Sequence, residues 1–438
     1  MRSSIFSRYA LSSFVAAMLA GCGGSQPMID PPGAMPQGVE EASSPSFRVL
    51  HRFGRMYGGG VDPQSALLNV NGTLYGTTRE THPCHRDRCG YGTVFSISAA
   101  GVKTTLYTFK GGASDGAYPD APLIDVDGTL YGTTLRGGGS GCSGDGCGTV
   151  FSISTSGSEK ILYRFQGGSD GANPASALIE VGGALYGTTL LGGGYNNCGG
   201  GTDTSGCGTV YSISPSGSES VLHAFKGIPD AAVPNTPLTY LNGTLYGVTP
   251  QGGVNCGDHT TGFPDGCGTV YSITTSGSET VLHRFKGQAD GRFPTGGLLD
   301  VHGTLYGTTG TLLWSRGSVY KISTDGTVTT LYRFQALPDA AVPDGGLIDA
   351  NGMLYGTTSE GGTVCITTGT FGCGTVFRVT TGGKEAVLYR FAGKASGLYP
   401  MAGLTYLKGR LYGTTPYGGD VGGGHCYLGC GIVFVLTP

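Results

Sequence analysis

Twelve of the thirteen cysteines fall into six close pairs, and Cys22 stands apart from them. Two thiols so near in sequence can close a short loop as a disulfide or hold a metal ion. Disulfides persist in exported proteins, and closing short loops stabilises a fold by roughly 2–3 kcal/mol each in the chain-entropy model. We therefore predict six disulfides. The predicted pairs are Cys84–Cys89, Cys142–Cys147, Cys198–Cys207, Cys256–Cys267, Cys365–Cys373 and Cys426–Cys430.

The first of these pairs also has the side chains of a metal site beside it. His82 and His85 flank Cys84, and with Cys89 they offer nitrogen and sulfur ligands at close spacing. The other five pairs have the same cysteine placement without such histidine neighbours, and oxidation would remove the thiolates that bind zinc. The sequence therefore predicts no metal and no other cofactor.

Acidic side chains recur at one position, each four residues before a proline. They are Asp115, Asp170, Asp230, Asp290 and Asp339. A ring of carboxylates could bind Ca²⁺ or a cationic ligand, yet an aspartate in a turn also accepts hydrogen bonds from nearby backbone amides. Their symmetric repetition favours the structural role. His51, His223 and His283 alternate with tyrosine at another repeated position, which likewise indicates packing.

Singular residues, which do not recur at repeated positions, are the better candidates for binding a ligand. The candidates are His82, His85, Arg86, His259, Trp314, Arg316 and His425. A single tryptophan on a binding face would suit stacking against a sugar or a peptide, although a lone tryptophan more often packs in a core. No Ser–His–Asp or paired-carboxylate spacing stands out, so we assign no catalytic residue.

The elements that position these residues follow from a pentapeptide, Leu-Tyr-Gly-Thr/Val-Thr, which occurs seven times at intervals of 49 to 60 residues. Its tyrosines are Tyr75, Tyr131, Tyr186, Tyr246, Tyr306, Tyr355 and Tyr412. A period of this length indicates one supersecondary unit stacked on copies of itself.

Each repeat contains four predicted strands, exemplified by residues 177–181, 74–78, 92–98 and 161–165. Pairs such as Asn71-Gly72 and Asp127-Gly128 separate the first strand from the second and tolerate positive φ at both positions, which predicts a tight hairpin. A second tight turn, usually Ser-Gly, follows the third strand. No stretch of helical period is long enough to compete, so we predict an all-β chain.

Four antiparallel strands per period, rich in glycine and aromatic residues, are typical of a β-propeller blade. The fourth strand appears before any other, at residues 47–53, and the last repeat ends at its third strand, around residues 432–436. We therefore predict a seven-bladed propeller, closed by the N-terminal strand completing the last blade. Such closure removes the open sheet edges that invite aggregation.

The two faces of the predicted ring differ. The turns between first and second strands, and between third and fourth, share one face and are predicted as uniform two-residue turns. The other face carries the connections between blades and the long loops between second and third strands, which differ in every repeat. We call the uniform face the base and the varied face the crown, where binding is expected because varied loops on a rigid scaffold usually bind.

Residues 1–21 form a predicted signal peptide, with Arg2 and Arg8 before an apolar stretch too short to span a bilayer. The segment ends Leu19-Ala20-Gly21-Cys22, which resembles a bacterial lipobox. This resemblance implies that Cys22 is lipidated, and Gly23 in the next position favours sorting to the outer membrane. We therefore expect a lipoprotein of the bacterial cell envelope, facing the periplasm or the surface.

The predicted domains are the signal peptide, a tether at residues 22–46 rich in Pro, Gly and Ser, and the propeller at residues 47–438. Only 13% of the residues are charged, and the formal net charge is −3. Without a basic stripe, nucleic acid is not an expected partner. The expected partners are the membrane, through the lipid anchor, and a glycan, peptide or protein ligand.

The repeat as a whole, Asn-Gly-Thr-Leu-Tyr-Gly-Thr-Thr, Gly-Gly, Cys-Gly-Thr-Val-Phe-Ser-Ile and Leu-Tyr-Arg-Phe, resembles the GloVer tandem repeats of bacterial choice-of-anchor exported proteins. The resemblance covers residues 47–438 and departs at Val248, Gly317-Ser318 and Gly431-Ile432. It implies surface anchoring and supplies no activity and no catalytic residue.

Two functions of different classes follow. The first is a non-catalytic scaffold that binds its ligand through the crown. The alternative is a carbohydrate-active or lactone-cleaving propeller enzyme, which would need acidic groups, histidines or a metal to converge near the ring axis. Titratable side chains are scarce outside the repeated positions, which favours the scaffold.

Overall fold

The computed structural model describes residues 45–54, 59–82, 90–195, 198, 206–256, 266–287, 290–310, 316–335, 337–365, 371–419, 426 and 428–438. All of the described residues fall in a single compact unit that spans residues 44–438. No helix in these described ranges has the length and apolarity to cross a lipid bilayer.

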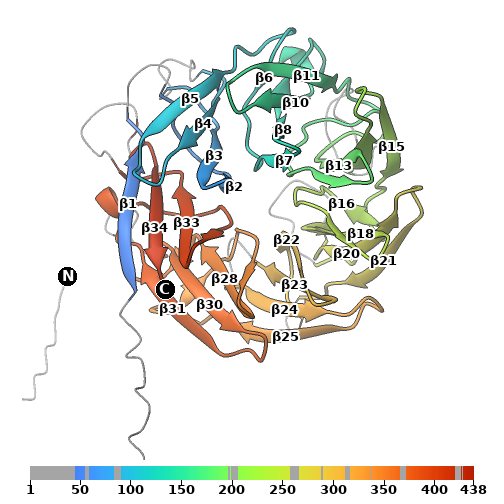
Figure 1. Cartoon of the computed structure of the whole chain (residues 1–438). Coiled ribbons are helices and arrows are strands. Elements are labelled where there is room, and N and C mark those ends of the chain that lie inside the picture. The colour runs from blue at the N-terminus through green and yellow to red at the C-terminus, as the bar shows by residue number, and fades with distance from the viewer. Residues whose placement is uncertain are drawn as a thin grey trace, which may run out of the picture. The chain divides into compact units, whose positions relative to one another are not determined.

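Seven four-stranded antiparallel sheets surround a common axis as the blades of a propeller (Figure 1). The innermost strands are β2 (Leu68–Val70), β7 (Ile124–Val126), β12 (Ile179–Val181), β17 (Thr239–Leu241), β22 (Pro294–Val301), β27 (Ile348–Ala350) and β32 (Thr405–Leu407). The second strands are β3 (Thr73–Thr78), β8 (Thr129–Thr134), β13 (Ala184–Thr189), β18 (Thr244–Thr249), β23 (Thr304–Thr309), β28 (Met353–Thr358) and β33 (Arg410–Thr415).

The outer half of each blade repeats the same pattern. The third strands are β4 (Thr93–Ile97), β10 (Thr149–Ser154), β14 (Thr209–Ile213), β20 (Thr269–Thr274), β24 (Ser318–Ile322), β30 (Thr375–Thr380) and β34 (Ile432–Thr437). The outermost strands are β5 (Lys103–Thr108), β11 (Glu159–Arg164), β15 (Glu219–Ala224), β21 (Glu279–Arg284), β25 (Val328–Arg333), β31 (Glu385–Arg390) and β1 (Ser46–Arg52). The predicted seven-bladed propeller is confirmed.

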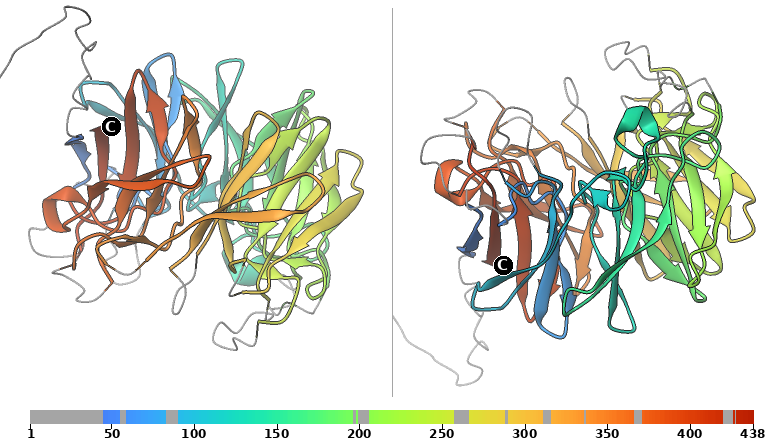
Figure 2. Two further views of the ribbon diagram at one scale, coloured as in Figure 1. Left: turned by 90° about the horizontal axis from the view of Figure 1, so that it is seen from below. Right: turned by 90° about the horizontal axis from the view of Figure 1, so that it is seen from above.

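Short two-residue strands pair the connection between blades with the loop that follows the second strand. These strands are β6 (Gly116–Ala117) with β9 (Arg136–Gly137), β16 (Ala231–Ala232) with β19 (Gln251–Gly252), and β26 (Ala340–Ala341) with β29 (Glu360–Gly361). Two single 3₁₀ turns, Cys142–Gly144 and Lys394–Ser396, also lie in these connections. The pairing confirms that both kinds of loop share the crown, and Figure 2 shows the blade strands running from one face of the ring to the other.

The hairpin turns between first and second strands form as predicted. Asn71 and Gly72 have φ values of 52° and 87°, and the corresponding pairs in the other repeats also have two positive φ values. This geometry matches the twist of the two flanking strands. His302-Gly303 and Lys408-Gly409 adopt the same turn, although neither His nor Lys favours positive φ.

The turns between third and fourth strands are longer than predicted. The Ser98 N–H donates to the Val102 carbonyl at 3.0 Å, and the Gly101 N–H donates to the Ser98 carbonyl at 2.8 Å. The loop therefore has three residues between the last paired positions rather than two. The prediction was wrong because the glycine, at φ 87° in Gly101, ends the turn instead of occupying its centre.

The ring closes where the sequence predicted. Strand β1 pairs antiparallel with β34, from Ser46 opposite Thr437 to Arg52 opposite Ile432, so the N-terminal strand completes the seventh blade. The side chain of Phe47 also stacks on Tyr389 of the sixth blade, with 3.9 Å between ring centroids. The closing strand is therefore held by its own sheet and by the neighbouring blade.

Aromatic side chains form the core between blades. Phe109, after the outermost strand of the first blade, meets Phe151 of the second blade edge to face, with centroids 5.2 Å apart. The same contact recurs at every junction, and Phe53 to Phe95 closes the series at 5.4 Å. Gly76 faces Phe95 so closely that a Cβ there would lie 2.8 Å from the ring. This contact explains why glycine sits at the centre of the repeated pentapeptide.

Threonine hydroxyls add hydrogen bonds between neighbouring blades nearer the axis. Thr133 donates to the Ser176 carbonyl at 3.3 Å, and Thr414 donates to the Ser65 carbonyl at 3.0 Å across the closing junction. Val248 replaces this threonine in the fourth blade and has no hydroxyl to donate. Its carbonyl instead accepts a hydrogen bond from Thr236 at 3.1 Å.

Candidate functional site

Two of the seven predicted ligand-binding residues lie in the part of the chain that the structure describes. His82 is half-buried in the loop that follows β3, and Arg316 is exposed in the short loop before β24. Both loops belong to the crown, but to the first and fifth blades. His85, Arg86, His259, Trp314 and His425 lie outside the described residues, as does the predicted lipidation site Cys22.

Five of the six predicted disulfides are present. They join Cys142 to Cys147, Cys198 to Cys207, Cys256 to Cys267, Cys365 to Cys373, and Cys426 to Cys430. Cys84 and Cys89 lie outside the described residues.

The disulfides also contribute to the contact between blades. The Cys147 carbonyl accepts the Asn173 N–H at 2.8 Å, and the Cys430 carbonyl accepts the Asp62 N–H at 3.1 Å. In each case the donor is the residue before the proline that leads into the next blade. Each disulfide therefore fixes a crown loop whose end holds the neighbouring blade, which keeps the crown loops at fixed relative positions.

The recurring aspartates have the structural role that their repetition indicated. The Asp115 carboxylate accepts the Lys110 N–H at 2.8 Å, the Gly116 N–H at 2.7 Å and the Tyr107 hydroxyl at 3.0 Å. Asp339 accepts the corresponding bonds from Gln335 and Ala340. These carboxylates close the loop between blades, so their lone pairs are used locally.

A glutamate of the next blade approaches each of four such aspartates at the outer edge of the ring. We call each group of Tyr or His, Asp and Glu a rim cluster. The rim clusters are Tyr107–Asp115–Glu159, Tyr163–Asp170–Glu219, His223–Asp230–Glu279 and Tyr332–Asp339–Glu385. Sequence analysis named the aspartates but missed the glutamates, which begin the outermost strand one repeat later.

Burial and the neighbouring aspartate disfavour a charge on these glutamates. Desolvation, with a smaller contribution from the Asp115 carboxylate, raises the pKa of Glu159 to about 7. The same two causes raise the pKa of Glu219 and of Glu385 to about 7. Near neutral pH, each of these carboxyl groups is therefore divided between its protonated and ionised forms.

At two of the other junctions, different side chains occupy the positions of the rim cluster. Between the sixth and seventh blades, Ser396 stands in for the aspartate, accepting the Ala392 N–H at 3.2 Å, and Phe47 replaces the glutamate. Between the seventh and first blades, Lys103 replaces the glutamate and donates to the Gly59 carbonyl at 2.6 Å. At these two junctions the aspartate and glutamate positions change together, whereas between the fourth and fifth blades Asp290 is kept and Val328 replaces the glutamate.

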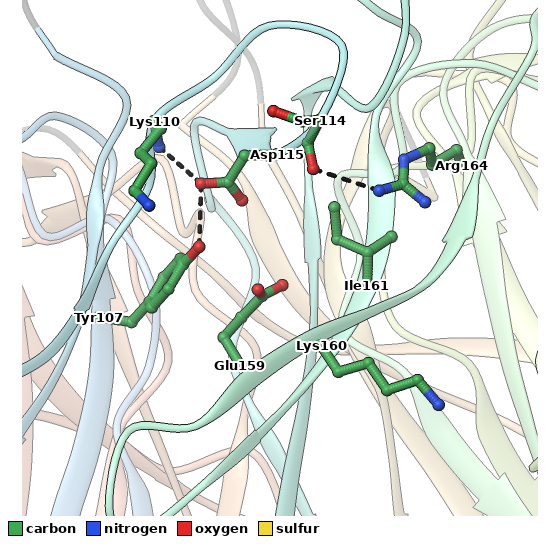
Figure 3. Close-up of a pocket in the computed structure, with 8 residues that line it drawn as sticks. All are labelled: Tyr107, Lys110, Ser114, Asp115, Glu159, Lys160, Ile161 and Arg164. Atoms are coloured by element: carbon green, nitrogen blue, oxygen red, sulfur yellow. Dashed lines mark hydrogen bonds between the residues drawn. The ribbon is translucent and has the colours of Figure 1, made fainter.

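One rim cluster borders a polar cavity of about 370 Å³ between the first and second blades (Figure 3). Tyr107, Asp115 and Glu159 lie on one side of it, and Arg164 donates to the Ser114 carbonyl at 3.2 Å on the other. Lys110 and Lys160 also line it. Asp115 accepts hydrogen bonds from Tyr107 and the backbone, and Arg164 donates to a backbone carbonyl, so we assign this cavity to the junction between blades rather than to a ligand.

Charged residues do meet on the crown, at the start of the first and second blades. The Arg79 guanidinium lies 3.1 Å from the Asp120 carboxylate, which is 14% exposed. Asp62 lies beside them, since its carbonyl accepts the Arg79 N–H at 3.1 Å, and Val61 pairs with Glu80. We call Asp62, Arg79, Glu80 and Asp120 the crown cluster.

The crown cluster has more acid than base, and its carboxylates are poorly hydrated. Burial raises the pKa of Glu80 to about 7 and that of Asp120 to about 6, with Arg79 opposing both shifts. Burial also raises the pKa of Asp62. One oxygen of Asp62 and one of Asp120 are buried without a hydrogen-bond partner. These oxygens could accept hydrogen bonds from a ligand, whose binding would compensate for their lost hydration.

A second crown group lies between the fifth and sixth blades. Burial raises the pKa of Asp344 to about 6, while a hydrogen bond from Ser359 opposes the shift. Burial also raises the pKa of Glu360, with further effects from Asp344 and from the predicted residue Arg316. Arg316 thus lies within electrostatic reach of a buried carboxylate pair.

The crown cluster was missed because its members are far apart in sequence. Arg79 and Asp120 are separated by 41 residues and meet only through the stacking of blades. A signal did exist in the repeat itself: Leu135, Leu190 and Pro250 occupy the position of Arg79. Ala175 occupies that of Asp120, although Asp344 repeats the aspartate in the sixth blade. A comparison of the charges at aligned positions of the repeats would have identified both residues.

Among solved structures, this fold is similar to several proteins at low sequence identity. A Xanthomonas campestris gluconolactonase is 15% identical over 66% of this chain and 78% of its own, with a TM-score of 0.38. The Niastella koreensis GH74 enzyme is 13% identical over 83% of this chain and 52% of its own, with a TM-score of 0.49. The PQQ-bound aldose sugar dehydrogenase of Streptomyces coelicolor is 13% identical over 90% of this chain and 98% of its own, with a TM-score of 0.41. Likeness at this level carries no argument about activity.

No curated protein matches the sequence. The profile of a repeat family does, over residues 41–202 and 199–427, which together span most of the propeller. These matches cover six whole blades, part of the seventh, and four of the five disulfides described above. The chain therefore belongs to the Gloeobacter/Verrucomicrobia repeat family.

Proposed function

We propose that this protein is a membrane-anchored, extracytoplasmic scaffold that binds a ligand through its crown without transforming it. The observation that carries the proposal is the crown cluster, in which four charged residues from two blades converge on the face with varied loops. The base, by contrast, repeats one hairpin geometry around the ring. A surface that differs from repeat to repeat is the one that can distinguish ligands.

The crown cluster favours a ligand that donates hydrogen bonds. Asp62 and Asp120 each have a buried oxygen without a partner, and such an oxygen gains most from a donor that replaces lost water. Glycan hydroxyls, peptide amides and ammonium groups all supply such donors. Arg79 can in turn donate to a carboxylate or a carbonyl of the same ligand.

The alternative function has one specific observation in its favour. Burial raises the pKa of Glu80 to about 7, which is the range of a general acid in sugar or lactone hydrolysis. Asp62 nearby would then be the second carboxylate. The scaffold is preferred because the same shift occurs in the rim glutamates, where burial at a packing interface explains it.

The test is a screen of glycan and peptide arrays with the purified full-length chain and five variants. Asp120→Asn and Arg79→Gln should weaken binding to the array members that the unchanged protein retains. Asp127→Asn makes the same chemical change in a base turn and should leave binding unchanged. Arg86→Ala and Trp314→Ala, outside the described residues, should each weaken binding by about 1–2 kcal/mol if they are anchors.

Measuring substrate hydrolysis distinguishes the binding scaffold from the enzyme. Aryl glycosides and gluconolactone are incubated with the unchanged protein and with Glu80→Gln. Hydrolysis that the unchanged protein catalyses and Glu80→Gln loses would establish the enzyme and overturn the scaffold. Equal effects of Asp120→Asn and Asp127→Asn on binding would show that the crown has been assigned wrongly.

The anchor has its own test. Cys22→Ser should release the protein from the membrane fraction or block removal of the signal peptide, because the lipid would no longer be attached. Fractionation and mass spectrometry of the mature N-terminus check this. Normal processing with unchanged membrane association would contradict lipidation at Cys22.

A further inference from the structure

The rim cluster between the third and fourth blades differs from the others in its chemistry. His223 projects from β15, Asp230 from the connection that follows, and Glu279 from the first position of β21. One potential ligand atom from each side chain lies within 4.8 Å of the other two. Among the described residues, this is the one group of three His, Cys, Asp or Glu side chains with that geometry.

Tyrosine occupies the position of His223 in the other three rim clusters. There its hydroxyl donates to the aspartate, at 3.0 Å for Tyr107, 2.7 Å for Tyr163 and 2.9 Å for Tyr332. The aspartate is then satisfied by a phenol, which is not a common metal ligand, while Oε1 of the glutamate is buried without a hydrogen-bond partner in all three clusters. An imidazole at that position combines with the two carboxylates into a nitrogen and oxygen donor set.

His283, at the next junction, provides an internal comparison. Its Nε2 lies 3.0 Å from the Asp290 carboxylate, in a normal hydrogen bond, and Val328 occupies the position of the glutamate. In the His223 cluster the corresponding distance is 3.5 Å, and Nε2 of His223 is buried without a hydrogen-bond partner. The cluster that has the glutamate is thus the one that lacks the direct His–Asp hydrogen bond.

The unsatisfied atoms face a shared space. Oε1 of Glu279 is also buried without a partner, while Asp230 is fixed in place by the Lys226 N–H at 3.0 Å and the Ala231 N–H at 2.8 Å. The side chains of His223 and Asp230 are 18% and 17% exposed, so the space is partly shielded from water. An ion here would satisfy the imidazole nitrogen and both carboxylates at once.

The separation of the His223 and Asp230 ligand atoms also agrees with a tetrahedral ion. Zinc–nitrogen and zinc–oxygen bonds of about 2.0–2.2 Å place two ligand atoms about 3.3–3.6 Å apart at the tetrahedral angle. Nε2 of His223 and Oδ2 of Asp230 are 3.5 Å apart. A direct hydrogen bond, as at His283, would be shorter.

We propose that His223, Asp230 and Glu279 form a zinc site that joins the third and fourth blades at the rim. Neutral His223 binds through Nε2, each carboxylate supplies one oxygen, and water fills the fourth position. The ion bridges two blades, because His223 and Asp230 belong to one and Glu279 to the next. This site is independent of the crown and of the function proposed for it.

Isothermal titration with ZnCl₂ tests the site in the oxidised, tag-free, full-length protein after treatment with a chelator. We expect one Zn²⁺ per chain and a higher melting temperature when it binds. His223→Tyr restores the residue of the neighbouring repeats and should therefore fold, yet it should lose this binding. Glu279→Val copies the fourth–fifth junction and should lose it as well. His283→Tyr is the matched control and should bind as the unchanged protein does.

Val328→Glu sharpens the test, because it adds the missing carboxylate beside His283 and Asp290. We expect this variant to bind two Zn²⁺ ions. X-ray absorption should show nitrogen and oxygen neighbours without sulfur, which excludes the cysteines. The proposal is overturned if the unchanged protein binds no Zn²⁺ at micromolar concentration, if His223→Tyr binds as tightly, or if Ca²⁺ is preferred.

Discussion

The base and the crown of this propeller are built from the same repeats but constrain the sequence differently. On the base, each turn between first and second strands has two positive φ values, whether it reads Asn-Gly, Gly-Gly or Lys-Gly. On the crown, the residue that follows the second strand is Arg79 in one blade and Leu135 in the next. The base thus repeats one turn geometry whatever its side chains, whereas the loops between second and third strands on the crown vary in length and in side-chain chemistry.

Residues that recur in every repeat therefore specify the ring, and residues that depart from the repeat specify its binding sites. The rim illustrates the same rule at one position, since Tyr163 and His283 both contact an aspartate but only a histidine offers a nitrogen ligand. Changes at repeated positions should therefore alter stability, and changes at singular positions should alter binding. The following predictions test that separation, from the largest expected effect to the smallest.

Deleting residues 47–53 should have the largest effect. The seventh blade would lose the strand that pairs with β34, and Phe53 would no longer contact Phe95. An unpaired edge and an exposed junction should cause aggregation, so soluble monomer should be lost in size-exclusion chromatography. If the truncated protein kept the melting temperature of the full chain, closure by strand exchange would be wrong.

Gly383→Ala should destabilise the base strongly. Gly383 has a φ of 90°, and a Cβ there would lie 2.5 Å from the Leu331 carbonyl of the preceding blade. We expect a loss of about 2–4 kcal/mol in the free energy of unfolding, measured by denaturant titration. Its neighbour Gly382 is the control, because the nearest atom to its Cβ would be 3.8 Å away. Gly382→Ala should be close to neutral, and equal effects of the two changes would contradict the contact.

The rim glutamates should make stability depend on pH. Each of Glu159, Glu219 and Glu385 has its pKa raised from 4.5 to about 7, first by burial and then by a neighbouring aspartate. Between those two pH values the folded protein holds protons that the unfolded chain has released. This contribution to stability is therefore complete below about pH 4.5 and is lost as the pH rises toward 7.

The triple variant Glu159→Gln, Glu219→Gln and Glu385→Gln removes these titrations. Its melting temperature, relative to the unchanged protein, should rise between pH 5 and pH 8, as measured by calorimetry. Glu180→Gln, an exposed change on β12, provides the control and should show no such trend. A difference that stays constant over this range would mean that the rim glutamates are ionised throughout.

Asp120→Asn should have the smallest effect on stability. Burial raises the pKa of Asp120 to about 6, so the loss of its ion pair with Arg79 is offset by the removal of a poorly hydrated charge. We expect a change within about 1 kcal/mol in the free energy of unfolding at pH 8, together with loss of ligand binding. A large loss of stability would show that the crown cluster stabilises the fold rather than binding a ligand.

Much of the fold could be predicted because its signals are local and repeated. Asn71-Gly72 predicts its own turn, and Cys142 lies near Cys147 in the sequence as well as in space. The turn at Ser98–Val102 was predicted too short, since the glycine that marks it does not by itself show where the ladder ends. The ring closure followed from counting strands at the two ends of the chain.

The crown cluster could not be predicted in the same way. Its contacts join residues of consecutive repeats, and no local pattern links Arg79 to Asp120. The rim pair Asp230 and Glu279 is likewise separated by most of one repeat. Burial, which sets the pKa of each of these carboxyl groups, is a property of the stacked blades and not of any segment.

The sequence by itself determined the number of blades, the closing strand, the five disulfides seen in the structure, and the division into a uniform and a varied face. These depend on hairpin turns, strand periodicity and short loops, whose energetics act over a few residues. The tertiary structure alone decided which charged side chains meet on the crown and which histidine lies near two carboxylates at the rim. Those contacts depend on how each blade packs against the next, because only packing brings distant side chains together and removes the water around them.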